Sequence, residues 1–114
     1  TFTPALNSMV ANIDFNPTVD RIRMVTNTGQ NFRLHPELGT VAATDGSING
    51  GSNPSITSIA YTNNIAGAST TDLYDIDVNT KKLYKKTPPN DGTLVEVGTI
   101  NVNFTGKGGF DKYF

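Results

Sequence analysis

The chain has 114 residues, with 9 basic and 10 acidic side chains and a net charge of −1. This balance excludes the strongly basic surface of a nucleic-acid-binding protein, and we expect no nucleic-acid partner. The absence of cysteine excludes disulfides, thiolate catalysis and cysteine-ligated zinc, and without a run of about 18 apolar residues we expect no insertion into a membrane.

Glycine and proline recur through the chain, and the short runs between them are rich in β-branched and aromatic residues, which predicts an all-β protein. In the first half, we expect strands at residues 11–15, 21–26, 31–35 and 40–43. Residues 44–54 are predicted to form a loop or linker, because they contain no apolar residue except Ile48. In the second half, we expect strands at 55–62, 71–77, 82–86, 94–97 and 99–104, with a proline-rich turn at 88–92.

The same order of predicted strands occurs twice in the sequence. Ile13 opens one copy and Ile59 the other, 46 residues apart, a spacing typical of one propeller blade. We therefore predict one all-β domain or fragment over residues 1–114. It would contain a first blade-like unit at 11–43, the loop at 44–54, a second unit at 55–104 and the start of a third at 105–114.

The predicted architecture is a propeller-like stack of antiparallel sheets, with a β-sandwich as the alternative. About two and a half units are fewer than the roughly four to eight blades that close a propeller, so we expect this chain to be part of a larger structure. One sheet cannot cover both of its apolar faces, and units of this kind must stack on neighbours. We expect a protein partner or self-association at an open sheet end, with Phe110, Tyr113 and Phe114 as candidate interaction residues.

Charged residues alternate with apolar ones at residues 21–26. This alternation predicts that Ile22 and Met24 face the core while Arg21 and Arg23 lie together on the exposed face. Arginine side chains could bind an anion there, together with Arg33 of the next strand. A surface ion network with acidic neighbours is the simpler interpretation.

Three carboxylates are candidate metal ligands. Asp75 and Asp77 share one face of a predicted strand, and Asp45 stands in a glycine-rich segment, so calcium is the cation that this oxygen-rich set would take. We expect no other cofactor. The simpler interpretations are a solvated sheet face opposite lysines 81, 82 or 85 and a flexible turn at Asp45.

The remaining candidate groups do not predict catalysis. His35 is the chain's one histidine, which excludes a metal site built from several histidines of this chain, and it is best interpreted as a surface turn residue. The tyrosines could form a platform for stacking sugars, but their positions on strands favour packing between sheets. They are Tyr61, Tyr74, Tyr84 and Tyr113.

Two stretches of sequence resemble a known family. The first is Ile13-Asp14-Phe15-Asn16-Pro17, continued by Asp20 to Arg23, Gly29 to Leu34, Pro36 and Gly39. The second is Ala60 to Asn64, continued by Leu73 to Asp77, Pro88 to Leu94 and Gly98. The string is similar to part of a bacterial, secreted, propeller-like family described as domain of unknown function 4394. The resemblance implies an extracellular or cell-surface location and brings no catalytic residues.

From these observations we expect a non-enzymatic structural or binding module that associates with a partner chain or a larger assembly through its open sheet ends. One alternative is a fragment of an enzymatic propeller with a metal or carboxylate site. The other is a carbohydrate-binding β-sandwich.

Overall fold

The structure is a computed structural model that describes residues 5–8 and 10–100. The strands in this part of the chain are β1 (Ala11–Phe15), β2 (Ile22–Thr26), β3 (Asn31–Leu34), β4 (Val41–Thr44), β5 (Ile56–Tyr61), β6 (Leu73–Asp77), β7 (Lys82–Lys86) and β8 (Leu94–Thr99). A short 3-10 helix, η1 (Pro89–Asp91), precedes β8. None of the helical structure described is long and apolar enough to cross a bilayer.

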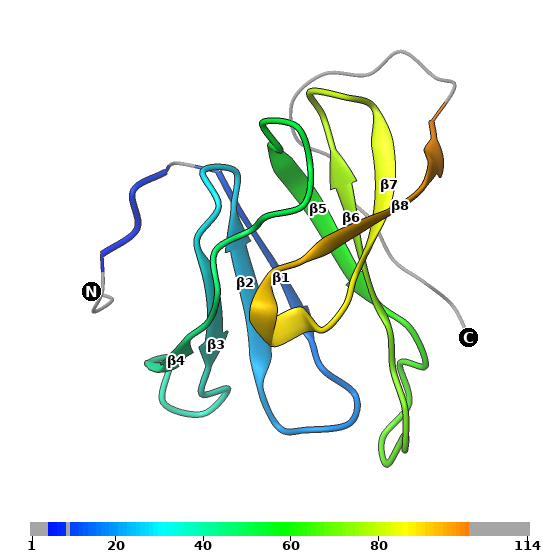
Figure 1. The fold of residues 1–114 in the computed structure, drawn as a ribbon. Coiled ribbons are helices and arrows are strands. Elements are labelled where there is room, and N and C mark those ends of the chain that lie inside the picture. The colour runs from blue at the N-terminus through cyan, green and yellow to red at the C-terminus, as the bar shows by residue number, and fades with distance from the viewer. Residues whose placement is uncertain (1–4, 9, 101–114) are drawn as a thin grey trace.

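The strands form two four-stranded antiparallel sheets, sheet 1 (β1–β4) and sheet 2 (β5–β8), each with its strands side by side in chain order (Figure 1). This confirms the all-β prediction. The strand positions agree with the expected ones to within two residues, except at the end, where residues 94–99 form one strand instead of parts of two. The start of a third unit, expected at 105–114, falls outside the described residues.

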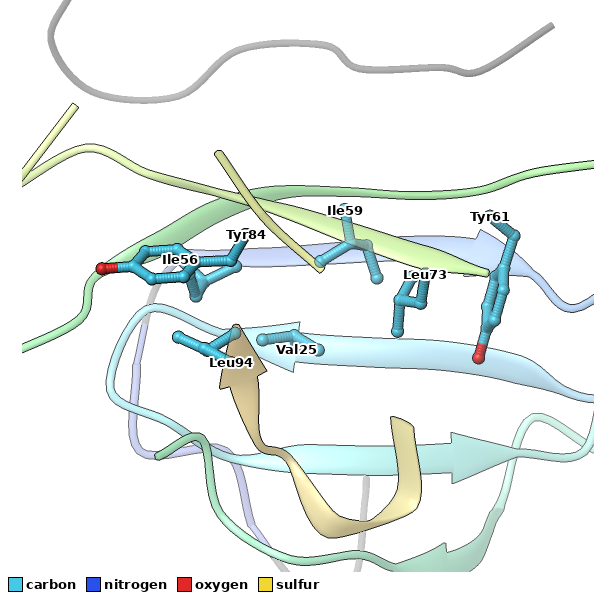
Figure 2. Packing of buried hydrophobic residues seen from close by; sticks show 7 residues of the cluster. All are labelled: Val25, Ile56, Ile59, Tyr61, Leu73, Tyr84 and Leu94. Atoms are coloured by element: carbon cyan, nitrogen blue, oxygen red, sulfur yellow. The ribbon is translucent and has the colours of Figure 1, made fainter. Parts of the chain in front are cut away.

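The two sheets bury an apolar cluster between their inner faces (Figure 2). Val25 of sheet 1 packs against a set of side chains from sheet 2, which are Ile56, Ile59, Tyr61, Leu73, Tyr84 and Leu94. Strand β5 contacts both β1 and β2, and all six of its residues are buried. Since each large apolar side chain contributes about 1.5–3 kcal/mol when fully buried, this cluster is the main attraction between the sheets.

The inner face of sheet 1 is the one that the sequence assigned to solvent. Arg23 is 1% exposed and points with Val25 towards sheet 2, so the prediction that Arg21 and Arg23 share an exposed face is wrong. Ile22 and Met24 point to the opposite, outer face. The alternation itself was correct, but its direction was inverted because hydrogen-bond partners from distant segments surround the Arg23 guanidinium.

The outer face of sheet 1 is apolar across three strands. The register places Ile13 beside Met24 and Met24 beside Phe32, and a second row contains Phe15, Ile22 and Leu34. Phe32 and Leu34 are buried, whereas Ile13 is 56% exposed and Phe15 is 59% exposed. This face therefore opens towards solvent at β1.

The link between the sheets is a tightly held segment, contrary to the expected flexible turn. Asn49 forms a parallel bridge with Thr93, and its carbonyl accepts the Leu94 N–H at 2.8 Å. A Cβ on Gly46 would lie 2.7 Å from the carbonyl oxygen of Asp91, and one on Gly50 would lie 2.6 Å from that of Leu94. Only glycine permits these close backbone approaches.

Candidate functional site

The inner faces also enclose a polar network centred on Arg23. Its Nε donates to the Tyr61 hydroxyl at 3.1 Å, and its Nη2 donates to Asn90 Oδ1 at 2.6 Å. Its Nη1 donates to Asn31 Oδ1 at 3.0 Å and to Asp45 Oδ2 at 2.6 Å. These acceptors come from both sheets, from the β4–β5 link and from η1, and together they satisfy the buried guanidinium.

Asp45 joins two arginines. Besides Arg23, it accepts hydrogen bonds from Arg33, with Nε 2.8 Å from Oδ2 and Nη2 2.9 Å from Oδ1. The carboxylate is almost wholly buried, whereas the Arg33 side chain is about one-third exposed. A bidentate contact of this kind fixes the orientation of the Arg33 guanidinium.

Asp75 and Lys86 form a second buried charged group. Both are on the inner face of sheet 2, both side chains are 0% exposed, and Nζ lies 3.0 Å from Oδ2. The contact is an ion pair without well-aligned hydrogen bonds. Burial raises the pKa of Asp75 and lowers the pKa of Lys86, while in each case the opposite charge of the partner works against the shift.

Asp77, the third candidate ligand, holds a turn. Its Oδ1 accepts the backbone N–H groups of Ser55 at 3.1 Å and Asn79 at 2.8 Å, and its Oδ2 accepts the Thr80 hydroxyl at 2.9 Å. These bonds close the β6–β7 turn and tie the start of β5 to it. Asp77 is completely buried, so its role in the described structure is that of an internal acceptor.

The candidate metal ligands are therefore each engaged by a different set of partners. Asp75 and Asp77 do share one face, as predicted, but that face is buried, and the lysine beside Asp75 is Lys86. Among residues 5–8 and 10–100, no group of three or more His, Cys, Asp or Glu side chains could hold a metal ion.

The tyrosines of the predicted platform are separated. Tyr61 and Tyr84 are buried in the core, as the packing interpretation predicted, while Tyr74 is half-buried on the outer face of sheet 2. Burial raises the pKa of Tyr61, and its hydroxyl points towards β2 (Figure 2). Its backbone N–H donates to Asp14 Oδ2 at 2.7 Å, so Asp14 also links the sheets.

Two openings lie at one end of the sheets. The larger, called here the cleft, has a volume of about 650 Å³ and is lined by residues 14–20 and 64–67. The smaller, called here the pocket, has a volume of about 320 Å³. Arg23, Arg33, Tyr61 and Asn90 are among the residues that line the pocket, which places the polar network at its wall.

Sequence reasoning missed Arg23 and Lys86 as internal groups. A usable signal was the place of each charged residue within the strand alternation, because Arg23 shares its side of β2 with Val25 and Lys86 shares its side of β7 with Tyr84. His35 is half-buried at the β3–β4 turn. The expected interaction residues Phe110, Tyr113 and Phe114 lie outside the described residues.

Comparison with known proteins and families identifies the family of the chain. No curated protein and no solved structure matches the chain. The family model described as Domain of unknown function (DUF4394) matches residues 1–114. The match covers every residue of the chain and agrees with the resemblance, which extends from Ile13 to Asp111. The chain belongs to the family described as domain of unknown function 4394.

Proposed function

We propose that this chain is a non-enzymatic structural module whose sheets are blade-like units, and that the outer face of sheet 1 packs against another sheet of the same kind. The observation that carries the proposal is that two large side chains of this apolar face, Ile13 and Phe15, are exposed to solvent. Covering both side chains would contribute on the order of 3 kcal/mol to association.

The repeat indicates what covers this face. Ile13 and Phe15 in β1 correspond, at the 46-residue offset, to Ile59 and Tyr61 in β5. Ile59 and Tyr61 are 3% and 1% exposed because sheet 1 lies over them. A sheet stacked on sheet 1 in the way that sheet 1 is stacked on sheet 2 would cover Ile13 and Phe15 equally.

The inner face of sheet 2 carries Ile59 and Tyr61, and the corresponding face of sheet 1 is its outer face. Sheet 1 therefore meets sheet 2 through the opposite face of the repeated unit, and the stacking is head to tail. The matching surface on a second copy is thus the outer face of sheet 2, which carries Tyr74, Ile76 and Leu83. A head-to-tail contact repeats until it closes a ring or continues as a filament. We therefore expect assembly through two different faces of the chain.

Sedimentation velocity over a range of concentrations tests the association. The chain should self-associate, and Ile13→Lys combined with Phe15→Lys should make it monomeric at every concentration. Leu38→Lys is the matched control, since Leu38 is 71% exposed in the β3–β4 turn, away from the proposed face. A monomeric parent chain at all concentrations would contradict the proposal.

Cross-linking tests the direction of stacking, helped by the absence of native cysteine. Ile13→Cys in one preparation and Ile76→Cys in another should form mixed disulfide-linked dimers on oxidation. Dimers formed by Ile13→Cys alone, with none in the mixture beyond that amount, would show a face-to-face contact instead.

A further inference from the structure

We propose that the pocket beside Arg23 and Arg33 binds a carboxylate of a small ligand, with the neutral body of that ligand lying in the adjoining cleft. The pocket does not include the outer face of sheet 1 that mediates the proposed assembly, and the cleft meets that face at Phe15. The module would then bind a small ligand in addition to a neighbouring sheet.

The charge at the pocket is positive. Arg23 and Arg33 are the charged residues that line it, and both are bound to the single carboxylate of Asp45, which does not line it. Two guanidinium charges and one carboxylate charge leave one positive charge at this wall. A single negative charge on a ligand would balance it.

Unused donors are present as well. Asp45 takes Nε and Nη2 of Arg33, but the Arg33 Nη1 group donates to no atom of residues 5–8 and 10–100. Arg23 uses one of its two Nη2 hydrogens, on Asn90. Because Asp45 and Asn90 fix both guanidinium groups, a bound carboxylate would find its donors already oriented.

The cleft provides room for the rest of the ligand. Asn16, Thr18 and Val19 line both openings, so the pocket and the cleft adjoin along the β1–β2 loop. Val19 is 52% exposed and Ile65, across the cleft, is 71% exposed, which offers apolar surface to a ring or short chain. A pocket of this size with a few convergent polar groups is typical of small-molecule sites.

Acidic residues in the cleft determine which part of a ligand can lie there. Asp14 and Asp20 line the cleft and not the pocket, so a second negative charge on the ligand would meet repulsion there. We therefore expect an aromatic or aliphatic monocarboxylate to bind more tightly than a phosphate dianion of the same size.

The probe is benzoate, compared with phenyl phosphate and benzylamine in buffer of constant ionic strength. Side-chain and backbone ¹H–¹⁵N spectra should show saturable shifts at Arg33 and along residues 16–19 with benzoate. Benzylamine should cause none. Absence of saturable shifts with benzoate, or tighter binding of phenyl phosphate, would overturn the proposal.

Asn90→Asp keeps the oxygen that accepts from Arg23 and adds a negative charge to the pocket, so the fold should persist while benzoate affinity falls about tenfold or more. Arg33→Gln should lower the affinity similarly. Arg21→Gln is the matched control, because Arg21 lines neither opening, and it should bind as the parent does. Equal benzoate affinity in the parent and in folded Asn90→Asp would overturn the proposal.

Discussion

The buried pair of Asp75 and Lys86 gives the sharpest test of the described core. Replacing Lys86 with methionine keeps most of the side-chain volume and leaves the Asp75 carboxylate without its counter-charge at 0% exposure. Breaking a buried pair from one side costs about 3–5 kcal/mol. Since domains of this size are stable by about 5–15 kcal/mol, Lys86→Met should lose a large part of the total.

The surface pair of Lys85 and Asp72 provides the control. Their charged atoms lie 3.3 Å apart with side chains 38% and 51% exposed, so Lys85→Met should change the free energy of unfolding by at most about 1 kcal/mol. The double variant Asp75→Leu with Lys86→Met removes both buried charges. It should recover most of the lost stability or exceed the parent, because a buried pair replaced by apolar groups is often neutral or stabilising.

The pH dependence follows from the direction of the Asp75 shift. Burial holds the folded pKa of Asp75 above its ordinary value of 3.8, and loss of Lys86 raises it further. In Lys86→Met, burying the ionised Asp75 carboxylate lowers the free energy of unfolding. This loss is absent at pH values below the ordinary pKa, and it grows as the pH rises from there through the raised folded pKa. The stability gap to the parent should narrow as pH falls from neutral, because in the parent the same protonation leaves Lys86 charged and unpaired.

Urea unfolding followed by tyrosine fluorescence measures these differences, since the chain has 4 tyrosines and no tryptophan. A loss of unfolding free energy in Lys86→Met no larger than that in Lys85→Met would show that the buried pair is not important for stability. A Lys86→Met loss that is independent of pH would show that the Asp75 carboxylate does not cause it.

Two more substitutions test the turns that join the strands. Gly92→Ala, at φ +70° and against the carbonyl of Gly46, should cost about 2 kcal/mol or more, whereas Gly98→Ala, with nothing near its Cβ position, should be almost neutral in thermal melting. Asp77→Ala removes the acceptor of three hydrogen bonds and should cost about 1–3 kcal/mol in urea unfolding, and a loss below about 0.5 kcal/mol would show that these bonds contribute little.

Strand positions could be predicted from the sequence because they depend on local pattern. Alternation at 11–15 and 73–77, together with glycine and proline between runs, specifies extended segments and turns without knowledge of the rest. The duplication of that pattern then predicted two similar sheets. Boundaries shifted by a residue or two because the ends of strands depend on the partner strand.

Which face lies inside could not be predicted in the same way. Alternation with a period of two is the same whichever face of the strand is buried. A charged residue normally indicates the exposed face, but Arg23 is on the buried one. Its partners Asp45 and Asn90 stand 22 and 67 residues away, and only folding brings them together. The same holds for Asp75, whose burial depends on Lys86 from the next strand.

The close passage of residues 46–50 against residues 91–94 has a consequence for recombination between family members. The segment that joins the two repeats pairs with both of them: Ile48 donates to the carbonyl of Gly29 in the first repeat, and Asn49 bonds to Gly92 and Leu94 in the second. Because Gly46 and Gly50 pack directly against Asp91 and Leu94, a chimaera that exchanges the second repeat should carry residues 46–54 with it and leave Asp45 with Arg23 and Arg33. A crossover placed after them would set foreign residues against Gly46 and Gly50, where there is no room for a side chain.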